Sequence, residues 1–123
     1  MKVKIDTKEK FNIIDVNEPV LYANMTEELD HLLRGYLQKE VKNVVLKLSG
    51  VTNIDEAIAK TICNVQQAFY DQSVSFVECE LQKTVEEFLD NIGLLEMLNV
   101  TPTVSEAGDI VQMEEIEREL LDS

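Results

Sequence analysis

Residues 43–57 read NVVLKLSGVTNIDEA and decide the fold. Val44–Leu48 is short, mostly apolar and rich in β-branched residues, and it ends at Ser49-Gly50, which is typical of a central strand. Asn53 and Glu56 have the spacing of a capping box, and Asp55 would face the positive end of the helix dipole. The segment therefore predicts a buried strand, a short connection and the start of a helix.

Downstream of this segment, apolar residues recur at helical spacing and predict a helix of about four turns. Its predicted buried stripe consists of Ala57, Ile58, Thr61, Ile62, Val65, Ala68 and Phe69. Residues 74–79 (VSFVEC) then favour a second strand. A strand, a helix and a strand in this order make a βαβ unit, which predicts a parallel sheet.

Upstream of the central strand, residues 2–17 alternate apolar and polar positions, which predicts an antiparallel strand pair. Asn24 and Glu27 fit another capping box, so we expect a helix from there to about Lys39. Its predicted buried face consists of Met25, Leu29, Leu32, Leu33, Tyr36 and Leu37.

Toward the end of the chain, Thr84 is the expected cap of a third helix that stops at Gly93. A short strand is predicted before Pro102, and a last helix from about Ser105. Its apolar side would consist of Ile110, Met113, Ile116 and Leu120. We therefore expect one domain over residues 1–123, with 105–123 as an acidic helix packed on it.

The composition limits the classes of partner. The 123 residues carry a net charge of −13, which repels nucleic acid and anionic lipid surfaces. No run of about 18 apolar residues or signal-peptide pattern occurs, so we expect a cytoplasmic protein without membrane insertion. Residues 105–123 hold seven acids against one base, Arg118. This segment is either a solvated helix face or a docking surface for a basic partner.

Catalytic patterns are absent from the sequence. The single histidine, His31, lies off the apolar stripe of its helix, and no serine or cysteine has a nucleophile setting. Cys63 and Cys79 lack paired-ligand spacing, so we expect reduced thiols and no metal site. The glycines are isolated, which excludes a phosphate-binding loop. We therefore expect no enzyme and no cofactor.

The junction after the central strand is the one candidate site. Asn53, Asp55 and Glu56 would lie at the carboxyl end of a strand, where open α/β folds place their functional groups. The same residues are also explained as a helix cap, with Asn53 capping and Glu56 completing the box. The spacing alone leaves both interpretations open.

The junction also resembles the STAS family, which contains the anti-sigma factor antagonists. Leu48-Ser49-Gly50-Val51, followed by Ile54-Asp55, matches the family's strand and the start of its next helix. Residues 84–94 and 104–107 resemble its third and last helices. The resemblance implies an α/β fold with a mixed β-sheet and helices packed mainly on one face. It also implies partner switching, in which phosphorylation of the serine after the aspartate breaks contact with a kinase-type anti-sigma factor.

Carried over by position, Asp55 matches the family's aspartate, and Glu56 occupies the place of the phosphorylated serine. Ala57 and Ile58 replace the following hydroxyl residue and glycine, and Lys47 replaces an aspartate of the strand. The resemblance therefore predicts a regulatory, protein-binding domain without a phospho-switch at Glu56.

The predicted partner surface consists of Asn53, Asp55, Glu56 and Lys60. Two alternatives stay open. The chain could be a STAS-like accessory subunit of a transport or lipid-handling system, because such domains also occur in transport systems. It could also be a small enzyme with paired carboxylates, which would need a cleft that brings Asp55 or Glu56 near another buried acid.

Overall fold

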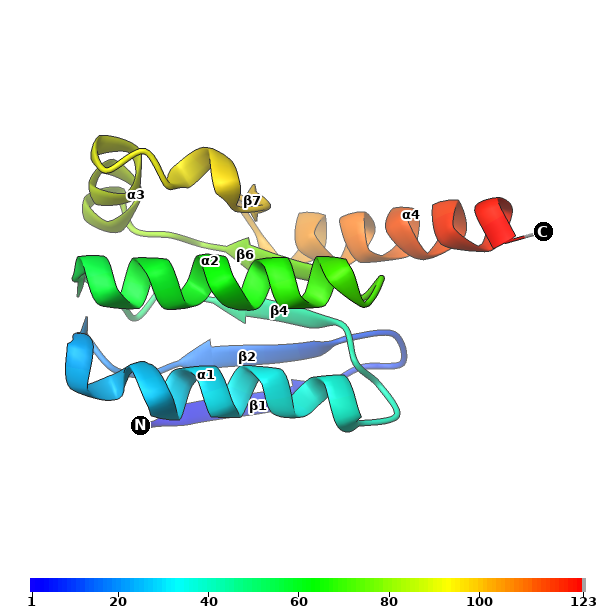
Figure 1. Ribbon diagram of the computed structural model, residues 1–123, viewed down its shortest axis with the longest axis horizontal. Coiled ribbons are helices and arrows are strands. Elements are labelled where there is room, and N and C mark those ends of the chain that lie inside the picture. Colours follow the sequence, from blue (N-terminus) through cyan, green and yellow to red (C-terminus); the bar gives the residue numbers. More distant parts are fainter. Residues whose placement is uncertain (123) are drawn as a thin grey trace.

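A five-stranded mixed sheet carries the fold in the computed structural model, which describes residues 1–122 (Figure 1). The strands are β1 (Val3–Thr7), β2 (Asn12–Val16), β3 (Val20–Leu21), β4 (Val44–Lys47), β5 (Asn53–Ile54), β6 (Phe76–Cys79) and β7 (Val100–Thr101). The helices are α1 (Thr26–Arg34), α2 (Glu56–Asp71), α3 (Lys83–Asn91) and α4 (Val104–Asp122), with 3-10 turns η1 (Ala23–Met25), η2 (Gly35–Gln38) and η3 (Leu95–Met97).

The sheet order is β1-β2-β4-β6-β7. β1 and β2 form the predicted antiparallel pair, in which Val3 is opposite Val16. β4 lies parallel to both β2 and β6, and β6 lies parallel to β7. The predicted βαβ unit around α2 is therefore confirmed. A separate two-stranded sheet joins β3 to β5 in parallel, close to the start of α2.

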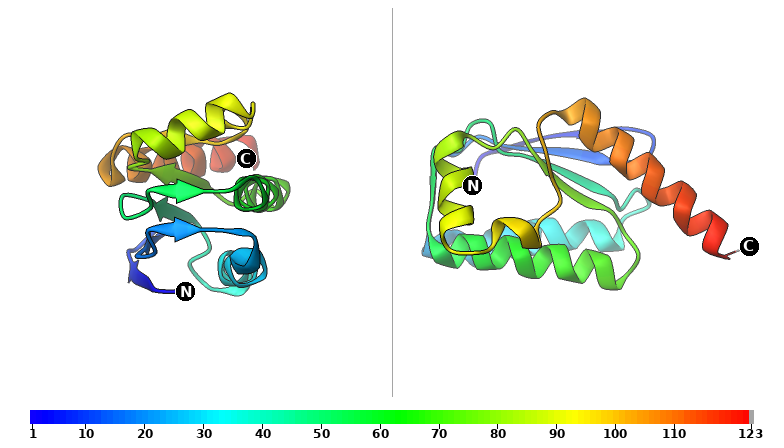
Figure 2. Two further views of the ribbon diagram at one scale, coloured as in Figure 1. Left: turned by 90° about the vertical axis from the view of Figure 1, so that its left-hand side faces the viewer. Right: turned by 90° about the horizontal axis from the view of Figure 1, so that it is seen from above.

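The larger core lies between the sheet and helices α1, α2 and α3. Alternate strand residues such as Ile14, Leu46 and Phe76 point into it, and Phe69 of α2 contacts Phe76 with ring centroids 4.9 Å apart. Figure 2 shows α1 and α2 side by side on one side of the strands. A smaller cluster on the other face packs β4 and β6 against the first half of α4. The prediction of helices mainly on one face is confirmed.

The predicted helix caps were wrong at three places. Asn24 lies within η1, and the N-cap of α1 is Met25, whose side chain makes no cap hydrogen bond. Asn53 lies in strand β5, so the cap of α2 is Asp55. Thr84 lies inside α3, which begins after Gln82. The end of α3 agrees with the prediction, because Gly93 follows it with a φ of 75°.

The predicted apolar side of α4 is confirmed only at Ile110, which is half-buried and packs against the smaller cluster. The helix contacts the sheet through Ala107, Gly108 and Val111. Met113, Ile116 and Leu120 are exposed instead, with 59%, 56% and 69% of their surface accessible. Figures 1 and 2 show the reason, since the second half of α4 runs out past the ends of the strands. The apolar side chains of this second half therefore have no sheet to pack against and stay exposed.

Both cysteines are free thiols, as the sequence predicts. Cys79 is buried in β6, and burial raises the pKa of its thiol to about 12. Cys63 is half-buried on α2, where burial and then the charge of Glu78 raise its pKa. Neither thiol has the lowered pKa that a reactive cysteine needs.

Candidate functional site

The loop after β4 is fixed from two directions. On one side Thr52 donates from both its backbone N–H and its hydroxyl to the Pro19 carbonyl, at 2.8 and 2.9 Å. On the other side the Gln82 amide donates to the Ser49 carbonyl at 2.6 Å, and the Thr84 hydroxyl donates to the Thr52 carbonyl at 2.6 Å. The loop is therefore held rigidly between the β3 segment and α3.

Gly50 allows the close approach that this loop requires. A Cβ atom at position 50 would lie 3.1 Å from the backbone oxygen of Val16, which is tighter than ordinary van der Waals contact. The glycine of Ser49-Gly50, which marks the end of the predicted strand, is thus required for close packing against Val16 as well as for the turn.

Asp55 joins two elements through one carboxylate. Its Oδ1 accepts a hydrogen bond from the Ile58 backbone N–H at 2.9 Å, which caps α2. Its Oδ2 accepts from the Ala23 backbone N–H at 2.7 Å, which ties the start of η1 to the start of α2. A carboxylate at a helix start is favoured by the helix dipole as well as by these bonds. Asp55 therefore positions the surface, and both of its oxygens are occupied by backbone donors.

The exposed part of the predicted surface consists of Asn53, Glu56 and Lys60. Glu56 and Lys60 form an ion pair of 3.2 Å on the first turns of α2, and each side chain is 64% exposed. An exposed pair of this kind adds little stability. Asn53 is exposed beside it, with its Oδ1 3.1 Å from the Thr52 hydroxyl oxygen. The structure thus brings the predicted residues together, with Asp55 beneath and the other three at the surface.

Lys47, which stands where the family resemblance has an aspartate, has a local explanation. Its ammonium lies 3.8 Å from the carboxylate of Asp15 on the neighbouring strand, and the two residues are paired in register. The sequence could have suggested this pair, because both residues lie at the ends of strands that were predicted. The carboxylate that the family has on β4 is replaced here by a cross-strand ion pair.

Replacing Asp55 should destabilise the fold measurably. We expect Asp55→Ala to lower the free energy of unfolding by about 2–3 kcal/mol, because it removes a helix cap and a second hydrogen bond to a charged group. Asp55→Asn should cost about half as much, since asparagine also caps helices well. Urea unfolding of both variants checks this, with Glu56→Ala as the control that should change stability by less than about 0.5 kcal/mol. An Asp55→Ala variant as stable as the parent would show that the carboxylate does not connect the two elements.

Comparison with known proteins identifies the family. The model of the STAS domain matches residues 2–107. The chain belongs to the STAS domain family. A search of curated proteins found no match.

Solved structures show the same STAS fold. A proposed anti-sigma factor antagonist of Thermotoga maritima is 21% identical, with 89% of this chain and 94% of that chain covered and a TM-score of 0.80. The anti-sigma factor antagonist SpoIIAA in its unphosphorylated form is 13% identical, with 90% and 96% covered and a TM-score of 0.71. The murine anion transporter solute carrier 26 family member A9 is 17% identical over 85% of this chain and 18% of that chain, with a TM-score of 0.72.

Within residues 1–122, no group of three or more histidine, cysteine or acidic side chains could hold a metal ion. No helix in that range is long and apolar enough to cross a membrane. His31 is exposed on α1, as its position off the apolar stripe predicts. Sequence reasoning missed Pro19 and Gln82, and it gave Thr84 only the role of a helix cap, because the loop residues that these three contact lie far away along the chain.

Proposed function

We propose that this STAS domain is a non-catalytic regulatory module of the anti-sigma factor antagonist type, acting in the cytoplasm of a bacterium. Its partner would dock on the start of α2 and read Glu56 and Lys60. The observation that carries the proposal is an exposed charged pair on the first turns of α2, directly after a loop that three side-chain hydrogen bonds to backbone carbonyls hold in place. A surface that is ordered before binding loses less entropy when a partner docks.

Glu56 distinguishes the proposed module from a phosphorylated one. A phosphoserine carries about −1.5 to −2 charges and three acceptor oxygens, whereas glutamate carries one charge on a planar carboxylate. Glu56 therefore acts as a weaker, permanent version of the phosphorylated residue, and nothing at this position can be switched by a kinase. Thr61, one turn further along α2, is a poor alternative site of phosphorylation, because it is half-buried and its hydroxyl donates to the Ala57 carbonyl at 2.9 Å.

A titration of Glu56 variants tests the proposal. The partner is first recovered by pull-down from the native cell extract and purified, and its affinity is then measured by calorimetry for Glu56→Gln and Glu56→Ala. We expect a change of at least about tenfold, which corresponds to about 1.4 kcal/mol, because charges at an interface centre commonly couple by more than that. The matched control is Glu87→Gln, because Glu87 and Lys83 also form an exposed (i, i+4) pair, on α3 and in the reverse order.

Each outcome has one meaning. Weaker binding makes Glu56 an attractive contact that a basic site on the partner reads. Stronger binding makes it a repulsive lock that holds the domain in the phosphorylated-like state. If both Glu56 variants bind like the parent and like Glu87→Gln, the partner does not dock on the start of α2 and the proposal is wrong.

A second candidate function is supported by one observation. The fold covers part of a murine anion transporter chain, so an accessory role in a transport system is the alternative. The same pull-down separates the two functions. A histidine-kinase-like ATPase supports the regulatory module, and a membrane transport protein supports the accessory subunit.

We propose no catalytic role for the acids at this site. Both oxygens of Asp55 accept from backbone N–H groups, and Glu56 pairs with Lys60. Paired-carboxylate catalysis needs an acid and a base that are free to exchange protons with a substrate. Within the described residues, the one fully buried acid is Glu78, which lies in β6 and not on this loop.

A further inference from the structure

A groove lies at the opposite end of α2 from the proposed partner surface. It has a volume of about 720 Å³ and runs between the last turns of α2, η3 and the second half of α4. Its lining includes Tyr70 on α2, Met97 and Leu98 at η3, and Glu114, Glu117 and Leu121 on α4. We call this the α2–α4 groove.

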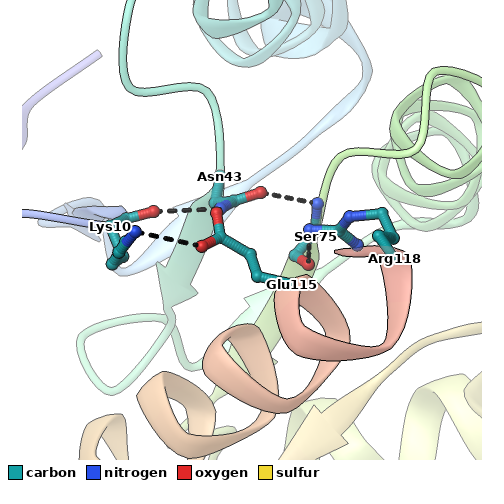
Figure 3. Close-up of polar contacts among 5 residues, drawn as sticks. All are labelled: Lys10, Asn43, Ser75, Glu115 and Arg118. Atoms are coloured by element: carbon teal, nitrogen blue, oxygen red, sulfur yellow. Dashed lines mark hydrogen bonds and ion pairs between the residues drawn. The ribbon is translucent and has the colours of Figure 1, made fainter. Parts of the chain in front are cut away.

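The wall that α4 forms is held in place by polar contacts (Figure 3). The Glu115 carboxylate accepts from the buried Asn43 amide at 2.7 Å and pairs with Lys10 at 3.7 Å. One turn further on, the Arg118 guanidinium donates to the Ser75 hydroxyl at 3.1 Å. These contacts fix the rotation of α4 about its axis. They therefore hold this wall of the groove in place, even though this part of the helix extends past the sheet.

Apolar side chains in the groove are unusually accessible. Tyr70 is 76% exposed, Met97 is 60% exposed and Leu121 is 84% exposed. They come from three separate elements and border one cavity. Large apolar side chains that gather in a concave region mark binding sites far more often than scattered ones do.

The charge around the groove selects the occupant. Glu114 and Glu117 line it, and no ion pair within residues 1–122 neutralises either one. Arg118 is the one base in the lining and offsets one of these two acids, so the lining keeps a net negative charge. A second copy of this chain, with its net charge of −13, would bring like charges together. A basic segment would be attracted, and its rate of association would rise.

We propose that the α2–α4 groove binds a basic amphipathic helix of a partner protein. Its apolar face would cover Tyr70, Met97 and Leu121, and its lysine or arginine residues would face Glu114 and Glu117. Helices dock in grooves of this kind through residues spaced at i, i+3 or i+4, and i+7. The proposal is independent of the surface at Glu56, because the groove lies at the other end of α2.

The test uses a synthetic 18-residue helix of leucine and lysine, with leucines on one face, titrated against the full chain. Fluorescence anisotropy gives the affinity, and amide chemical shifts in NMR spectra give the site. We expect saturable binding with shifts at the groove residues, and binding that weakens with added salt. The combined variant Tyr70→Ser, Met97→Ser and Leu121→Ser should weaken binding at least about tenfold. These side chains are exposed, so the fold should survive their replacement.

Matched controls separate the groove from general attraction to an acidic protein. Ile5→Ser combined with Tyr22→Ser removes exposed apolar groups elsewhere and should leave the affinity unchanged. Glu117→Lys should weaken binding, whereas Glu27→Lys on α1 should have a clearly smaller effect. A peptide of the same composition with its leucines scattered should bind at least about tenfold more weakly, because it has no apolar face.

Three results would overturn the proposal. The first is no saturable binding of the amphipathic peptide. The second is equal binding by the scattered peptide or by the groove variant, which would mean diffuse charge attraction. The third is a concentration-dependent dimer, seen by sedimentation, whose interface covers the groove. Variants at Glu56 should leave peptide binding unchanged, so failure here and failure of the proposed function are distinguishable.

Discussion

Replacing Glu78 with glutamine should make the protein more stable above about pH 5, and the gain should grow with pH. Glu78 lies on β6, an inner strand of the sheet, and has no accessible surface. Its Oε1 accepts from the Asn99 backbone N–H at 3.1 Å, while its Oε2 has no hydrogen-bond partner within residues 1–122. Burial is the main cause that raises the pKa of this carboxyl well above its ordinary value of 4.5, and backbone hydrogen bonds oppose the rise.

The direction of the pH dependence follows from proton binding. In the unfolded chain Glu78 loses its proton near pH 4.5, whereas in the folded chain it keeps the proton to a higher pH. The folded state therefore binds more protons in this window, so its stability falls as pH rises. The loss is at most about 1.4 kcal/mol per pH unit from the one group. It begins at the unfolded pKa and ends at the folded pKa.

Urea unfolding between pH 4.5 and 7.5 measures the effect as the difference between Glu78→Gln and the parent. We expect the two stabilities to diverge as the pH rises through this range, with Glu78→Gln becoming the more stable protein. Taking the difference removes the repulsion that other acids contribute to both proteins. Glu40→Gln, in the exposed segment between η2 and β4, is the control and should show a much smaller divergence. Parallel curves for Glu78→Gln and the parent would mean that Glu78 is not held neutral by the fold.

Much of the architecture follows from local pattern. The two predicted central strands, Val44–Leu48 and residues 74–79, match β4 and β6 to within two residues at each end. The prediction succeeds because a short apolar run between turn residues is typical of a buried parallel strand. The hairpin of β1 and β2 follows from alternation, and Gly93 ends α3 through its positive φ. These features depend on residues that are neighbours in sequence, so a single amino-acid sequence is enough to predict them.

The features that the sequence did not predict depend on distant partners. Asn53 and Asp55 are both good caps, and β5 pairing with β3 decides between them, since it holds Asn53 in a strand. Met113 and Ile116 have the spacing of a buried helix face, yet both are exposed. The spacing of apolar residues does not show where the sheet beneath the helix ends. The Asp55 carboxylate accepts a hydrogen bond from the Ala23 backbone N–H, 32 residues away along the chain, and no rule of local spacing predicts such a contact. Local propensity is overridden where tertiary contacts compete.

Asn43 is the second residue whose loss should have a large effect. It precedes β4, is nearly fully buried, and uses its side-chain amide three times (Figure 3). Its Nδ2 donates to the Lys10 carbonyl at 2.9 Å and to Glu115 at 2.7 Å, and its Oδ1 accepts from the Ser75 backbone N–H at 2.8 Å. One side chain therefore joins the segments before β2 and β6 to helix α4.

We expect Asn43→Ala to lower the free energy of unfolding by about 3–5 kcal/mol. The lost hydrogen bonds to Lys10 and Glu115 cost about 1 kcal/mol each, and the buried Ser75 N–H that is left without its partner costs about 1–3 kcal/mol. Asn43→Asp should be at least as harmful, because it removes both donors and places a second carboxylate beside Glu115. Chemical unfolding gives both values.

Glu115→Gln provides the contrast for this prediction. A glutamine can still accept from Asn43, and it loses only the partly exposed ion pair with Lys10, so it should cost less than about 1 kcal/mol. If Asn43→Ala were no worse than Glu115→Gln, the amide would merely fill space at this end of the sheet. If it is far worse, Asn43 is the point that fixes α4 against the strands. The α2–α4 groove, whose wall α4 forms, should then bind the leucine–lysine helix more weakly in the Asn43→Ala variant, at a pH and temperature where that variant is still folded.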